Sequence, residues 1–228
     1  MTSSSRISEG PWSIYSFAPI DSRTYVLIED SAALIVDPMD HPEMLADLTA
    51  GGVSRATVLL THEHYDHCGG VNWLRERVSV EVIASDACAA NLQRPAINGS
   101  RYFEALFALH DQATRDQVRA LGVQPYTTTA DTTFSERLEF GWGGHGITIT
   151  EAPGHTPGSV LIDVDDEWLF TGDSWIPGRQ TVTRLPGGSS AQYEAVTKPQ
   201  LDALLPLRTV LPGHHDPVVA SGSGRARD

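Results

Sequence analysis

Thr61-His62-Glu63-His64-Tyr65-Asp66-His67 directly follows the apolar run Thr57–Leu60, and a helical pattern begins near Gly69. In an extended chain, residues two positions apart point to the same side, so the first two histidines of this motif can present their imidazoles to one ion. The turn that follows redirects the aspartate and the third histidine. The motif therefore predicts two adjacent metal positions at the carboxyl end of a buried strand.

The alternative interpretation is a histidine-rich surface loop, but such loops seldom lie directly at the end of a buried strand. Imidazole and carboxylate ligands suit zinc, iron or manganese. The chain has two cysteines, Cys68 and Cys88, which lack the paired spacing of a closed structural zinc site. These features favour an open, catalytic metal site, with Cys68 as a small buried residue where a helix starts.

Three further candidate ligands stand in turn-like settings after apolar segments. They are His155 in Pro153–Gly158, Asp173 in Thr171-Gly172-Asp173, and His214 in Leu211-Pro212-Gly213-His214. A glycine precedes each of them, which lets the backbone approach a ligand closely.

The complete set is similar to that of the metallo-β-lactamase superfamily, whose His-x-His-x-Asp-His motif is followed by a histidine, an aspartate and a histidine in the same order. The resemblance covers nearly the whole chain, and the joint pattern is highly specific. It implies a first metal held by three histidines, a second metal held by an aspartate and two histidines, and an aspartate bridging the two. The implied ligands are His62, His64 and His155 for the first metal, Asp66, His67 and His214 for the second, and Asp173 for the bridge.

The resemblance also implies the chemistry of the site. Two zinc ions are expected, with iron or manganese as alternatives. A bound cation lowers the pKa of its water towards about 7, which provides hydroxide at neutral pH, and a second cation can hold the leaving or carbonyl oxygen. Asp66 is the expected catalytic residue, because it can orient that hydroxide and pass a proton to the leaving group.

Several neighbouring residues leave alternatives open. His215 follows His214 directly, and we choose His214 as the ligand because its place after Gly213 matches the family pattern. Asp37, in Val36-Asp37-Pro38, is interpreted as structural support near the site, as similar sequences suggest. Five more residues are candidates for contact with substrate: His110, Tyr65, Trp175, Arg179 and Arg184. The alternative for each is a role only in packing or at the solvated surface.

Alternating patterns predict an α/β fold in which two mixed β-sheets pack face to face with helices on both outer faces, a four-layer αββα sandwich. We expect strands at residues 12–17, 24–29, 33–37, 57–61, 78–84, 127–134, 137–140, 146–151, 159–164 and 167–171, the first three as an antiparallel meander. We expect helices at residues 41–50, near 71–74, from 85 onwards and at 190–204. Residues 93–124 contain helical spacing interrupted by Pro95 and Gly99, which predicts a loop-and-helix insertion that could cover the site.

Length and composition set the remaining expectations. A chain of 228 residues with 40% hydrophobic residues is expected to form one domain, residues 1–228, with a disordered tail at 221–228. The net charge of −13 would repel a phosphate backbone, so nucleic acid is not an expected partner. No apolar run resembles a membrane span or signal peptide, which favours a cytoplasmic protein without a membrane partner. The oligomeric state stays open, with a dimer as one possibility.

Departures from individual branches of the superfamily narrow the function. Secreted β-lactamases of the best-known subclass have cysteine where Asp173 stands, and glyoxalase II has a glutathione-binding helical extension after the last ligand. Flavodiiron proteins replace the second histidine of the motif by glutamate. The expected function is therefore hydrolysis of a thioester, lactone or related activated acyl bond in a small molecule. Alternatives are a mononuclear iron persulfide dioxygenase, a β-lactam-hydrolysing enzyme, or a binding protein that retains the ligands without turnover.

Overall fold

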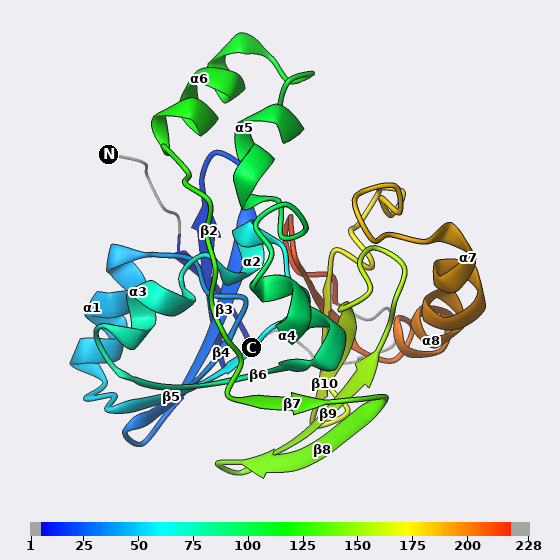
Figure 1. Ribbon diagram of the computed structural model, residues 1–228. Coiled ribbons are helices and arrows are strands. Elements are labelled where there is room, and N and C mark those ends of the chain that lie inside the picture. Colours follow the sequence, from blue (N-terminus) through cyan, green and yellow to red (C-terminus); the bar gives the residue numbers. More distant parts are fainter. Residues whose placement is uncertain (1–5, 220–228) are drawn as a thin grey trace.

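The computed structural model describes residues 6–219, which form two mixed β-sheets packed face to face (Figure 1). The tail at residues 221–228, expected to be disordered, lies outside the described residues. The first sheet has the order β1-β2-β3-β4-β5-β6-β7, antiparallel as far as β4 and parallel from β4 to β7. Its strands are β1 (Arg6–Glu9), β2 (Trp12–Phe17), β3 (Ser22–Glu29), β4 (Ala32–Val36), β5 (Arg55–Leu59), β6 (Ser79–Ser85) and β7 (Thr132–Phe134).

The second sheet has the order β12-β11-β10-β9-β8 and is antiparallel except for the parallel pair β11 and β12. Its strands are β8 (Arg137–Trp142), β9 (His145–Glu151), β10 (Val160–Val164), β11 (Trp168–Gly172) and β12 (Thr209–Pro212). The helices are α1 (Pro42–Ala50), α2 (Tyr65–Cys68), α3 (Val71–Arg75), α4 (Asp86–Leu92), the 3₁₀ turn η1 (Ser100–Tyr102), α5 (Phe103–Leu106), α6 (Gln112–Ala120), and the continuous segment α7 (Ser190–Gln192), η2 (Tyr193–Thr197, a π-helix) and α8 (Lys198–Leu204).

Side-chain alternation along the strands explains the layers. In β4, Leu34 and Val36 face the second sheet, whereas Ala33 and Ile35 face the helices α1, α3 and α4. Every residue of β4 is buried, as expected for a strand covered on both faces. A third cluster, which includes Leu201, joins the outer face of the second sheet to α8. Three apolar layers between four layers of secondary structure confirm the predicted αββα sandwich.

One predicted strand is mostly wrong. Of residues 127–134, only Thr132–Phe134 form a strand, because side chains of α3 and of Gln93, which follows α4, bind the backbone of the preceding segment. Asn72 donates to the Thr127 carbonyl, Gln93 to that of Thr128 and Arg75 to that of Thr129. These backbone groups are therefore satisfied without a partner strand. The sequence patterns also gave no prediction of β1 or β12.

The predicted insertion at residues 93–124 contains η1, α5 and α6, and it extends away from the two sheets at the top of Figure 1. Within residues 6–219 no helix combines the length and apolar character needed to cross a bilayer.

Candidate metal centre

The candidate ligands lie on loops that follow strands of both sheets. The motif follows β5, His155 lies between β9 and β10, and Asp173 and His214 follow β11 and β12. Glycine is required at two of these strand ends. A Cβ on Gly172, whose φ is +48°, would lie 2.4 Å from the Thr61 hydroxyl, and one on Gly213 would lie 2.5 Å from Asp173 Oδ1. These glycines let the ends of β11 and β12 come into contact with the motif.

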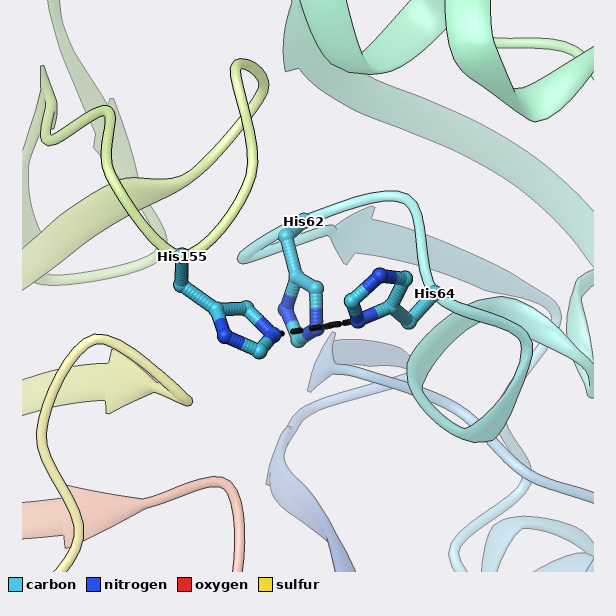
Figure 2. Close-up of side chains that lie close together, drawn as sticks. All are labelled: His62, His64 and His155. Atoms are coloured by element: carbon cyan, nitrogen blue, oxygen red, sulfur yellow. Dashed lines mark hydrogen bonds between the residues drawn. The ribbon is translucent and has the colours of Figure 1, made fainter. Parts of the chain in front are cut away.

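His62, His64 and His155 form the first group of ligand atoms, here called the three-histidine cluster. Figure 2 shows the three rings pointing toward one another from two different loops. His64 Nδ1 lies 3.1 Å from His62 Nε2 and 3.0 Å from His155 Nε2. Nitrogens on a tetrahedral zinc at about 2.05 Å would be about 3.3 Å apart, so the cluster fits such an ion with a small adjustment.

Asp66, His67 and His214 form the second group, here called the Asp66 cluster. Asp66 Oδ2 lies 3.7 Å from His67 Nε2 and 3.6 Å from His214 Nε2. The three ligand atoms lie within 4.8 Å of one another. One carboxylate and two imidazoles match the preferences of zinc, iron and manganese.

Asp173 lies between the two clusters and turns one oxygen toward each. Its Oδ1 is 3.4 Å from both His67 Nε2 and His214 Nε2, and its Oδ2 is 3.7 Å from His155 Nε2. Among the described residues, buried Asp173 Oδ1 and His67 Nε2 have no hydrogen bond of acceptable geometry. Buried polar atoms without partners are rare, and a cation between them would satisfy both. The residues present therefore fit a metal at each cluster.

Hydrogen bonds on the far side of three rings fix the direction in which the ligand nitrogens point. His67 Nδ1 donates to Asp37 Oδ2 at 3.0 Å, and His155 Nδ1 donates to the Val182 carbonyl at 2.7 Å. His214 Nδ1 donates to the backbone carbonyl of residue 20 at 3.1 Å. Each donation turns Nε2 toward the cluster, where it can bind a metal once it is deprotonated, as in known metal sites.

Asp37 stands behind the ligands and supports them. In addition to the hydrogen bond from His67, Asp37 accepts hydrogen bonds from the Thr61 backbone NH at 2.7 Å and from the Thr61 hydroxyl at 2.5 Å. Asp37, His62 and His67 also lie close enough together to resemble a ligand group. Because the carboxylate of Asp37 already binds Thr61 and His67, we assign it to the orientation of the motif, as the sequence suggested.

The two clusters differ in how readily their imidazoles hold protons. Burial lowers the pKa of His62 and His155 and lowers that of His64 to about 3. In the Asp66 cluster, burial opposes the charged form, but the carboxylates of Asp66 and Asp173 outweigh it and raise the pKa of His67. The three-histidine cluster is thus neutral at pH 7, whereas His67 tends to stay protonated in the metal-free protein.

This difference predicts the pH dependence of metal uptake. A metal at the Asp66 cluster must displace protons from His67 and from His214, whose pKa Asp173 also raises against the effect of burial. Below the pKa of each of these histidines, affinity there is expected to rise by about tenfold per pH unit for each displaced proton, whereas affinity at the three-histidine cluster should depend less on pH. Chelator competition at about pH 6, 7 and 8 would measure the metal affinity of both clusters. Equal pH dependence at the two positions would contradict this prediction.

Glu63 is a buried residue of the motif whose role the sequence interpretation missed. It points away from the ligands, and its two oxygens accept hydrogen bonds from Asn91 Nδ2 and the Thr156 hydroxyl, both at 2.8 Å. Burial raises the pKa of its carboxyl group. Glu63 therefore links the motif loop to α4 and to the loop that carries His155. The signal in the sequence was alternation, because Glu63 must face opposite to its two histidine neighbours.

Replacing Glu63 by alanine is expected to destabilise the protein by about 2–5 kcal/mol, because two buried donors lose their acceptor. Glu63→Gln keeps the shape and one carbonyl acceptor and should cost less. Urea denaturation of the metal-free proteins would measure both. A free energy of unfolding for Glu63→Ala equal to that of the unmodified protein would show that the link contributes nothing.

Two cavities open onto the metal centre, and some of the remaining sequence candidates line the larger one. His215 is one of them, but its ring points away from the clusters, with Nδ1 3.8 Å from Asp21 Oδ2. His110 and Arg179 line the same cavity. Tyr65 packs between the rings of Phe103 and Tyr126.

Within residues 6–219, neither cavity at the centre is lined by Tyr65, Trp175 or Arg184. Trp175 packs against the apolar cluster beneath α8. Buried Cys68 donates its thiol to the Glu63 carbonyl at 3.4 Å, which agrees with its interpretation as a packing residue.

The chain is similar in sequence and structure to several known proteins. The chain is 26% identical over 205 residues to the probable metallo-hydrolase YqgX of Bacillus subtilis (strain 168), across 89% of each protein. It is 29% identical over 154 residues to a hydroxyacylglutathione hydrolase of Anaeromyxobacter dehalogenans (strain 2CP-C), across 68% of this chain but 46% of that relative. The crystal structure of the BLEG-1 B3 metallo-beta-lactamase superposes with a TM-score of 0.72 at 27% identity, across 91% of this chain and 93% of that one.

The family model described as the metallo-beta-lactamase superfamily matches residues 19–214. This range contains the motif at His62–His67 and ends on the last candidate ligand, His214. The chain therefore belongs to the metallo-β-lactamase superfamily.

Proposed function

We propose that the protein is a hydrolase with two metal ions, zinc by preference, that cleaves a thioester, lactone or related activated acyl bond. The observation that carries this proposal is the position of Asp173, whose two oxygens face different clusters of ligands. The names of the relatives support hydrolysis in general. The name hydroxyacylglutathione hydrolase supports an acyl compound as the substrate. The proposed ligands are those of the three-histidine cluster, those of the Asp66 cluster, and Asp173.

Metal ions bound here would supply hydroxide at neutral pH by lowering the pKa of water, and would stabilise negative charge on the carbonyl oxygen. For a thioester, the carbon–sulfur bond breaks, a carbon–oxygen bond to water forms, and the departing sulfur takes a proton. Asp66 is the proposed residue for that proton, because its carboxylate lines both cavities at the centre and is only partly buried.

Elemental analysis of the purified protein, together with assays on a panel of thioesters, lactones and the β-lactam nitrocefin, tests the proposal. We expect two metal equivalents per chain and turnover of thioesters or lactones that chelation abolishes. One iron per chain with oxygen consumption would favour the dioxygenase instead. Turnover of nitrocefin alone would favour a β-lactamase, the activity in the name of BLEG-1.

A further inference from the structure

Two cavities of different character open onto the metal centre. The smaller has a volume of about 160 Å³ and the larger about 400 Å³. Asp66, His155, Asp173 and Val182 line both, so the two cavities meet directly above the ligands. A molecule that reacts at the centre can therefore extend into both.

Each cavity adjoins a different cluster. His64 lines only the smaller cavity, which places that cavity beside the three-histidine cluster. His214 lines only the larger one, which places it beside the Asp66 cluster. The two ends of a bound molecule would thus face different metal positions.

The walls of the smaller cavity are mostly apolar. The insertion contributes Ile97, Phe103 and Leu106, and the loop after Asp173 contributes Leu185 and Pro186. Its other lining side chains include those of the metal centre and the polar Asn98 and Tyr102. Apolar walls of this kind bind an apolar group by removing its surface from water.

The larger cavity has more polar side chains beyond the ligands than the smaller one. Its lining includes His110 from the insertion, Asp21 from the loop between β2 and β3, and Arg179 and Gln180 from the loop after β11, besides apolar residues such as Phe107. Arg179 is exposed and forms no ion pair with the residues that the structure describes, so its charge is free to meet a polar or anionic group. This cavity suits a hydrophilic part of the substrate.

We propose that the smaller cavity is the acyl-chain site of a medium-length acyl substrate, of about four to six carbons, whose polar leaving group lies in the larger cavity. This proposal rests on the proposed hydrolase function. A dry apolar cavity of about 150 Å³ holds one benzene ring, which limits a chain in 160 Å³ to about six carbons. Leu106 on α5 lines the cavity and is 47% exposed, so a larger side chain at this position tests the limit.

A series of S-acyl-N-acetylcysteamine thioesters from acetyl to dodecanoyl tests the length limit. We expect kcat/KM to rise by about two- to fourfold for each methylene as far as hexanoyl and to level or fall beyond it. Leu106→Trp should lower the ratio of kcat/KM for hexanoyl to that for acetyl by at least about tenfold. The matched control is Leu109→Trp, because Leu109 lies in the same insertion, is fully exposed and is not part of the lining.

Binding of simple carboxylates provides a readout that needs no turnover. Calorimetric titration of the zinc-loaded protein with acetate, butyrate, hexanoate and octanoate should show affinity that increases up to hexanoate, and Leu106→Trp should remove that increase. A flat series, or equal effects of Leu106→Trp and Leu109→Trp, would overturn the acyl-chain site even if thioesters are hydrolysed. Chain-length-dependent binding without hydrolysis of any acyl substrate would retain the site and overturn the hydrolase function.

Discussion

Asp173→Ala is expected to remove both metal ions from the protein and to lower kcat/KM by more than about 100-fold. The carboxylate turns one oxygen toward each cluster, so its loss removes a ligand from both positions. Loss of a residue that only supports a ligand already costs about 10- to 100-fold in affinity or activity, and loss of a shared ligand should cost more. Metal content after gel filtration and the acyl hydrolysis assay would measure the two effects.

Asp173→Asn removes the negative charge of the side chain and keeps its shape. An amide presents only one oxygen, so this variant should retain metal at one position and lose it at the other. Asp202→Ala is the matched control, because Asp202 is an exposed aspartate on α8 whose ion pair with Lys198 contributes little. Two metal equivalents in Asp173→Ala would show that Asp173 is not a shared ligand.

Asp37→Ala is expected to weaken metal binding at the Asp66 cluster by about 10- to 100-fold, although Asp37 is not a proposed ligand. Its carboxylate holds Nδ1 of His67, and without that bond the ring is free to change tautomer and orientation. The same variant leaves the buried Thr61 NH without an acceptor, which should lower the free energy of unfolding by about 1–3 kcal/mol.

Two measurements on Asp37→Ala keep these effects apart. Chelator competition reports the affinity of each metal position, and urea denaturation of the metal-free protein reports stability. Asp37→Asn can still accept a hydrogen bond from Thr61 and should recover most of the stability but not the affinity. Unchanged affinity at both positions in Asp37→Ala would contradict the assignment of Asp37 to the orientation of His67.

The sequence was sufficient to predict the fold where apolar patterns were strong. β3 is buried from Ser22 to Leu27 and β4 throughout, and the apolar runs in both segments predicted strands of the layered arrangement. β1 was missed because its side chains are mostly exposed, which leaves no alternation to detect. β12 was missed because it has only four residues and runs into Pro212 and Gly213.

The sequence motifs located the candidate ligands on loops that follow strands, and the structure brings these side chains together. The cavities could not, because they depend on contacts between segments far apart in the chain, such as Leu106 on α5 and Leu185 after β11. The hydrogen bonds of Glu63 with Asn91 and Thr156 were missed for the same reason.

The most direct test of the shared-ligand metal centre is anomalous scattering from a crystal of the zinc-loaded protein, recorded above and below the zinc absorption edge. We expect two peaks, one bounded by His62, His64 and His155 and one by Asp66, His67 and His214, with Asp173 between them. A single peak between Asp37, His62 and His67, or none near these side chains, would contradict the account.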